Sequence, residues 1–95
     1  MTEPQPTVRS KVSLTDITDK IKKTTYTILP DTTTTVCQLH MENGFIILGT
    51  SACVDPALFN QALGEKYAFE KAIDKAWELE GYLLAQEKFI ATRSI

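Results

Sequence analysis

The residues that could carry out chemistry in this 95-residue chain are few and lie far apart in the sequence. It has one histidine, His40, and two cysteines, Cys37 and Cys53, with no Cys-x-x-Cys pair of the kind that holds zinc. It has no Walker loop, no G-x-G-x-x-G fingerprint, no triad and no paired-carboxylate motif. Because no nucleophile, base and orienting group coincide, we predict a protein that is not an enzyme. The same residues predict no metal site and no cofactor.

Other residues suit binding rather than catalysis. Thr50 and Ser51 supply hydroxyl groups, and Asp55-Pro56 and Asn60 mark helix starts whose first amide N–H groups lack intrahelical partners. Hydroxyls beside free amides are suited to an anion. The combination is also found where an ordinary helix begins, so it does not specify a ligand.

Aromatic and cationic side chains alternate along the second half of the chain. Tyr67 and Tyr82 accompany Lys66, Lys71 and Lys75. A ring beside a lysine could stack a base and neutralise a phosphate. Any solvated helix face has the same composition, and both interpretations stay open.

Glu80 is the one acidic residue placed among apolar helix positions, between Trp77 and Leu83 at helical spacing. A buried carboxylate without a partner costs several kcal/mol or takes up a proton. We therefore expect Glu80 to accept bonds from a lysine, a threonine or a backbone edge, across a subunit boundary or within the chain. A ligand or ion contact is the alternative.

The elements that position these residues centre on a hairpin over residues 36–51. Asn43-Gly44 is the dipeptide that favours a two-residue turn, and residues that favour strands flank it. Such a turn pairs Leu39 with Leu48 and Cys37 with Thr50. Alternation then gives one apolar face, formed by Cys37, Leu39, Met41, Ile46 and Leu48. The opposite face carries Val36, Gln38, His40, Glu42, Phe45 and Ile47.

The remaining pattern predicts an α+β fold. A short N-terminal helix is expected over residues 13–23, a strand over 24–29 completes a three-stranded antiparallel meander, and a long amphipathic helix packs on the sheet from about residue 60 to 86. We expect one domain over residues 12–90, a flexible arm over 1–11 and a frayed tail over 91–95.

The hairpin has apolar residues on both faces, which usually means that both faces are covered. The long helix covers one. Phe45 and Ile47, with His40, would then need the N-terminal helix or another subunit, so we predict a homo-oligomer.

Net charge and hydropathy limit the classes of partner that the chain could bind. The net charge of −2 and the pI of about 5.3 argue against a general nucleic-acid binder. No apolar run reaches the ~18 residues of a membrane span. We predict a cytosolic protein that contacts neither membrane nor nucleic acid.

Several segments form a series that resembles a known family: Asn43-Gly-Phe45, Gly49-Thr-Ser-Ala-Cys-Val-Asp-Pro56, Phe59-Asn60, Gly64 and Trp77-Glu-Leu-Glu-Gly-Tyr-Leu-Leu84. The resemblance is to small phage and prophage accessory proteins, typified by early-region genes of tailed phages, and it runs from about Thr15 to Lys88. Thr50 stands where many members have glutamate, so no role rests on charge there. The resemblance implies action in the host bacterial cytoplasm.

The chain is also similar to the Thoeris anti-defence proteins of the first type. This similarity implies an oligomeric sponge that sequesters a cyclic nucleotide-type immune signal without cleaving it. The expected ligand-binding residues are the available cations, the aromatic and the polar groups above, namely Arg9, Phe45, Thr50, Ser51, Asn60, Lys66, Lys71 and Arg93. The alternative is a phage protein that inhibits a host protein by direct binding through the Phe45/Ile47 face or the acidic helix.

Overall fold

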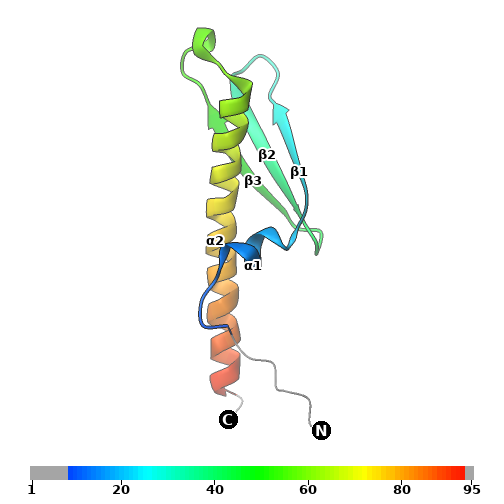
Figure 1. Cartoon of the computed structure of the whole chain (residues 1–95), viewed down its shortest axis with the longest axis vertical. Coiled ribbons are helices and arrows are strands. Elements are labelled where there is room, and N and C mark those ends of the chain that lie inside the picture. Colours follow the sequence, from blue (N-terminus) through cyan, green and yellow to red (C-terminus); the bar gives the residue numbers. More distant parts are fainter. Residues whose placement is uncertain (1–8, 94–95) are drawn as a thin grey trace.

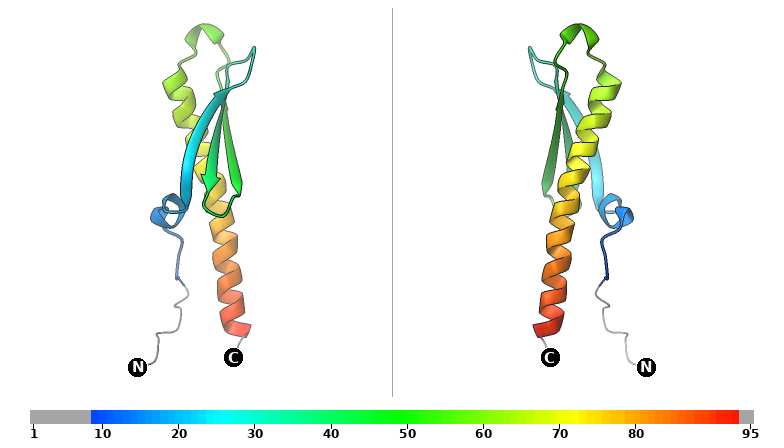
Figure 2. Two further views of the ribbon diagram at one scale, coloured as in Figure 1. Left: turned by 90° about the vertical axis from the view of Figure 1, so that its right-hand side faces the viewer. Right: turned by 90° about the vertical axis from the view of Figure 1, so that its left-hand side faces the viewer.

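The computed structural model describes residues 9–93, which fold into a three-stranded antiparallel sheet with one long helix packed against it (Figure 1). The elements follow in the order α1 (Leu14–Thr18), β1 (Ile21–Ile28), β2 (Thr34–Met41), β3 (Ile46–Ala52), the 3-10 turn η1 (Pro56–Leu58) and α2 (Gln61–Arg93). The predicted α+β architecture is therefore confirmed. The radius of gyration is 17.7 Å, well above the roughly 13 Å of a compact domain of this size. The shape is elongated because α2 runs past the sheet (Figures 1 and 2).

The N-terminal helix is real but shorter than expected. Ser13 caps it in a capping box, in which the Ser13 hydroxyl accepts from the Asp16 amide and the Asp16 carboxylate accepts from the Ser13 amide at 2.8 Å. The chain then turns into β1 at Ile21, which pairs with Met41 of β2. Pairing with β2 thus overrides the helical spacing that predicted a helix as far as residue 23.

The central hairpin forms at the predicted place with a different turn. The Met41 amide donates to the Phe45 carbonyl at 2.9 Å, so the loop has three residues, and Gly44 has a φ of 89°. This is the arrangement of a type I turn followed by a left-handed residue. The Asn43 side-chain oxygen accepts a hydrogen bond from the Phe45 amide, and the Asn43 backbone does not adopt a left-handed conformation.

The longer loop shifts the pairing of β3 by one residue. Leu39 pairs with Ile47, not Leu48, and Cys37 pairs with Gly49, not Thr50. A shift of one exchanges the faces of a strand. Ile47 is therefore only 5% exposed beneath α2, whereas Ile46 and Leu48 are 40% and 42% exposed on the opposite face.

The register overturns the predicted second-face cluster of Phe45, Ile47 and His40. Phe45 and Ile47 belong to the side of β3 that meets α2, and His40 belongs to the other. Phe45 and Ile47 therefore give no reason to expect a second subunit, and the apolar side chains left uncovered are Ile46 and Leu48. Any argument for one must use Ile46, Leu48 or the edge of the sheet.

The first half of α2 packs closely against the sheet through small residues. Ala68, Ala72 and Ala76 are at most 1% exposed. A Cβ atom added to Gly49 would overlap the Ala68 carbonyl oxygen and the Ala72 amide, and would lie 2.8 Å from Ala72 Cα. Glycine at this position lets the helix backbone approach the strand backbone directly.

The second half of α2 extends beyond the strands (Figure 2). It ends at Arg93, not near residue 86, so residues 91–93 of the expected tail are helical. Trp77 and Leu83, predicted to face the sheet, are 37% and 43% exposed, because little of the sheet lies opposite them. From the expected arm, the Ser10 carbonyl accepts from Lys88 Nζ at 2.9 Å. Residues 1–8 and 94–95 lie outside the described range.

Candidate functional site

A pocket opens where α2 leaves the tip of the β2–β3 hairpin. It has a volume of about 300 Å³. Its lining comes from the hairpin, from the turn between α1 and β1 and from the middle of α2, namely Lys20, Met41, Glu42, Asn43, Phe45, Ile47, Leu79, Glu80 and Leu83. We call it the hairpin pocket. It exists because the strands end here while the helix continues.

Three apolar side chains of the hairpin pocket are open to solvent. Phe45 is 55% exposed, Leu79 is 47% exposed and Leu83 is 43% exposed. Leu79 and Leu83 are one helical turn apart and therefore share one side of α2. Apolar walls with a few polar groups at the rim are typical of small-molecule sites.

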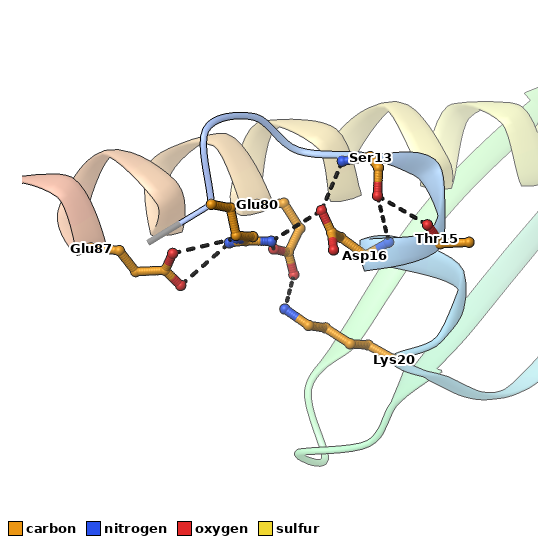
Figure 3. Close-up of polar contacts among 7 residues, drawn as sticks. Ser13, Thr15, Asp16, Lys20, Glu80 and Glu87 are labelled. Atoms are coloured by element: carbon orange, nitrogen blue, oxygen red, sulfur yellow. Dashed lines mark hydrogen bonds and ion pairs between the residues drawn. The ribbon is translucent and has the colours of Figure 1, made fainter. Parts of the chain in front are cut away.

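Glu80 lines the pocket and carries the most buried carboxylate of those in ion pairs within the described chain, with a side chain 9% exposed. Lys20 Nζ lies 2.6 Å from its Oε1, and Arg9 Nη1 lies 3.1 Å from its Oε2 (Figure 3). The expectation that a lysine satisfies Glu80 is confirmed, and the lysine belongs to the same chain. Two cations on one buried carboxylate make it a structural anchor.

Arg9 joins three acidic side chains. Beyond Glu80, its Nε and Nη2 each lie 3.4 Å from a Glu87 oxygen, and Nη1 lies 3.4 Å from Asp16. The hydrogen bond to Glu80 raises the pKa of the Arg9 guanidinium above its ordinary value. The Ser13 amide lowers the pKa of Asp16, and Arg9 acts in the same direction. Arg9 is thus engaged in fixing residues 9–16 to α2.

The other expected binding residues do not gather within one chain. Thr50 lies on the exposed face of β3, and Ser51 lies on the helix side. Asn60 caps α2 by accepting from the Leu63 amide at 3.1 Å. Lys66 Nζ lies 6.0 Å from the Tyr67 ring centroid, whereas Lys71 is exposed.

The last expected binding residue stands at the far end of α2. The Arg93 guanidinium lies 5.6 Å from the Phe89 ring centroid. Of the eight expected ligand-binding residues, Phe45 alone lines the hairpin pocket, together with Glu80, for which a ligand contact was the alternative role. A ligand that used the others as well would need more than one copy of the chain.

His40 takes part in a polar cluster on the open face of the sheet. The Thr25 hydroxyl lies 3.0 Å from Gln38 Oε1 and 3.1 Å from His40 Nε2. These contacts link β1 to β2, so the histidine contributes to strand pairing. In residues 9–93, no group of three or more His, Cys, Asp or Glu side chains could hold a metal ion.

The two thiols differ in environment. Cys37 is fully buried, and this burial raises the pKa of its thiol. Cys53 is half-buried and donates to the Asp55 carbonyl at 3.1 Å. The expectation that Cys37 is a small core residue is confirmed.

Sequence reasoning missed most of the hairpin pocket. The sequence places Glu42 on a strand face, Asn43 in the turn and Lys20 in the N-terminal helix, and it gives Leu79 no role. The i, i+4 pair Leu79 and Leu83 bracketing Glu80 was the available signal. The pocket was hidden because the one-residue register error placed Phe45 on the wrong face.

The comparisons with known proteins give a family and no individual relative. Residues 12–88 match the model of a phage protein family described as N4 Gp49/phage Sf6 gene 66. No curated protein and no solved structure gives a significant match. In the described part of the chain, no helix is both long enough and apolar enough to cross a membrane.

Proposed function

The chain belongs to the N4 Gp49/phage Sf6 gene 66 family of phage proteins, and we propose that it sequesters a cyclic nucleotide-type immune signal in the cytoplasm of the infected bacterium. It binds the signal without cleaving it. The observation that carries the proposal is the hairpin pocket, whose mouth presents the half-exposed ring of Phe45.

The hairpin pocket has the size and walls for a nucleoside. Its volume of about 300 Å³ is at the small end of the range for ligand pockets. The Phe45 ring offers a stacking surface, and stacking a base on an aromatic ring contributes about 1–3 kcal/mol. Leu79 and Leu83 supply an apolar wall.

The charges that line the hairpin pocket determine which part of the ligand it can hold. Glu42 and Glu80 outnumber Lys20, whose ammonium group already contacts Glu80. Carboxylates accept hydrogen bonds from ribose hydroxyls, but they repel phosphates. The base and ribose therefore occupy the pocket, and the phosphates lie outside its mouth.

The phosphates need cations that this pocket does not supply. Lys66, Lys71 and Arg93 lie elsewhere on the elongated chain. A second copy could bring such groups to the mouth of the pocket, and this is the reason for including homo-oligomerisation in the proposal. A site shared between copies would also explain why the expected binding residues are dispersed in one.

A ligand panel tests the proposal. Thermal shift with cyclic nucleotides and ADP-ribose derivatives should identify a stabilising compound, with about 2.7 kcal/mol gained at 100 times its Kd. Phe45→Ala should weaken that binding by about tenfold or more through lost stacking. Tyr82→Ala removes a 73% exposed ring of α2 that does not line the pocket, and it should leave the affinity unchanged.

Mass spectrometry of the released compound completes the experiment. A sponge returns its ligand chemically intact after the protein is denatured. Conversion of the ligand would show an enzyme instead. Silence of the wild-type protein across the panel would contradict the proposal, as would equal losses in both aromatic variants.

One observation favours a second function, the inhibition of a host protein by direct binding. The half of α2 beyond the sheet exposes Tyr82 at 73% and Phe89 at 53%. Exposed apolar groups gathered on one surface mark interaction sites. A host protein whose capture is lost in Tyr82→Ala or Phe89→Ala, yet kept in Phe45→Ala, would support this alternative.

A further inference from the structure

The sheet has two free edges, and they differ in how they are protected. Among residues 9–93 the strand order is β1-β2-β3, so within that range β1 and β3 each have one side without a strand neighbour. A free edge presents unpaired N–H and C=O groups and is a template for another strand. Natural sheets discourage such pairing with lysines, prolines and bulges.

The β1 edge carries these protective features. Lys22 and Lys23 are exposed at its start, and the pairing with β2 is irregular between Ile21 and Lys23. A second strand approaching here would meet two positive charges and a bulge. The β1 edge is therefore unsuited to pairing.

The β3 edge has none of them. The segment from Phe45 to Cys53 contains neither a charged residue nor a proline. Ile46 and Leu48 are 40% and 42% exposed, as part of the same strand. An uncharged edge of this kind, with large apolar side chains exposed beside it, is one that a partner strand would cover.

Hydrogen bonds at the two ends of β3 fix which backbone groups face outward. The Phe45 carbonyl accepts from Met41 of β2, and the Cys53 amide donates to Thr33 at the other end. Alternate residues of an antiparallel strand bond to the same neighbour. The amides and carbonyls of Ile46, Leu48, Thr50 and Ala52 therefore point away from β2.

We infer that β3 pairs with β3 of a second copy, antiparallel and about a two-fold axis, so that two three-stranded sheets become one of six strands. A register centred on Gly49 places Ile46 opposite Ala52 of the partner subunit and Leu48 opposite Thr50 of the partner subunit. All the outward backbone groups of β3 are then satisfied. The exposed isoleucine and leucine each gain a cross-strand neighbour.

The chemistry of the edge selects a second copy as its occupant. An isologous interface must be compatible with itself, and a strand without charges has nothing that repels its own image. The two β1 edges remain outermost in such a dimer. Because their lysines and bulges oppose further pairing, the assembly closes at two copies instead of growing into a fibre.

This inference stands apart from the proposed ligand. The β3 edge lies on the sheet, and its exposed side chains face away from the hairpin pocket. If the protein is a dimer that binds no nucleotide, the proposed ligand is wrong and the pairing of the β3 edges still stands. If a monomer binds the nucleotide, the pairing of the β3 edges is wrong and the binding role of the hairpin pocket still stands.

Light scattering and amide exchange test the pairing on the full-length protein. We expect a mass twice the 10.6 kDa of one chain. The amides of Leu48 and Thr50 should exchange at least about tenfold more slowly than those of Thr24 and Tyr26, which face outward on the unpaired β1 edge. A mass of one chain, or equally fast exchange at both edges, would overturn the inference.

Matched lysine substitutions separate the two edges. Leu48→Lys places like charges across the two-fold axis and should raise the dimer dissociation constant by at least about tenfold. Thr27→Lys adds the same charge to the same open face on β1 and should leave the mass unchanged. Circular dichroism checks that both variants fold. A dimer that survives Leu48→Lys as well as it survives Thr27→Lys would show that another surface joins the copies.

Discussion

The two halves of α2 are held to the rest of the chain by different forces. Residues 61–76 lie on the sheet, where Ala68, Ala72 and Ala76 meet a strand that has glycine at position 49. Residues 77–93 extend past the sheet, where Glu80 and Glu87 form ion pairs with Arg9 and Lys20 and where Leu84 is buried. Close backbone packing fixes the first half, whereas the second half is held by ion pairs in addition to apolar contact.

This difference shows what each half can tolerate. Backbone contact leaves no room for an added atom, so the sheet-bound half is sensitive to volume. Ion pairs that are partly exposed give modest stability and fix positions through charge. The side of residues 61–76 that meets the sheet therefore tolerates no added volume, whereas the distal half tolerates changes away from its ion pairs and from Leu84.

Gly49→Ala should give the largest effect. The new Cβ would overlap backbone atoms of Ala68 and Ala72, which cannot rotate away, so α2 must move off the sheet. We expect the free energy of unfolding to fall by about 3 kcal/mol. Urea denaturation followed by circular dichroism measures it.

Gly81→Ala is the matched control in the distal half. A Cβ added there meets nothing within 4 Å. Alanine is the better helix former, so this variant should gain about 0.5–1 kcal/mol. Equal losses in the two variants would contradict the contrast between the halves.

Glu80→Ala tests the charged half and should have an intermediate effect. It leaves Lys20 and Arg9 beside an apolar wall without their shared carboxylate. Losing one partner of a fully buried pair costs about 3–5 kcal/mol, and partial exposure of these cations lowers the expected loss to about 2 kcal/mol. Amide exchange in α1 should also rise, since Arg9 and Lys20 flank that helix.

Glu78→Ala is its control, because Glu78 is exposed on the same stretch of α2. It should change stability by less than about 0.5 kcal/mol. If Glu80→Ala were as mild as this, the ion pairs would be surface contacts of little weight. The distal half would then be held by apolar packing.

Much of the architecture was readable because local chemistry and tertiary structure agree. The segment that begins at Ser13 predicted a short helix, Asn43-Gly44 predicted the hairpin, and the apolar spacing after residue 60 predicted the long helix. Glu80 was identified as a buried carboxylate with a lysine among its expected partners. Each of these signals depends on neighbours within a few residues.

The register of β3 could not be read in the same way. Asn-Gly is compatible with a two-residue and a three-residue loop, and Phe45-Ile-Ile-Leu48 is apolar whichever face is buried. Gly49 decides between them, because only a residue without a side chain fits beneath Ala68 and Ala72. That contact is visible only once the helix is in place. The predicted register therefore puts the β3 residues of the hairpin pocket and of the sheet edge on the wrong faces.

Thr35→Val should have a smaller effect than Gly49→Ala or Glu80→Ala, and one of opposite sign. The Thr35 hydroxyl is buried under α2 near Gly64 and has no hydrogen-bond partner among the described residues. Valine has the same shape without the polar group, so the folded state should gain about 1 kcal/mol. Thr25→Val makes the same exchange where the hydroxyl contacts Gln38 and His40, and it should lose a similar amount. Thermal unfolding of both variants and the wild-type protein shows whether each substitution raises or lowers the stability. A loss in Thr35→Val would mean that a water satisfies this hydroxyl, and the packing between α2 and the sheet would then be looser than Gly49 implies.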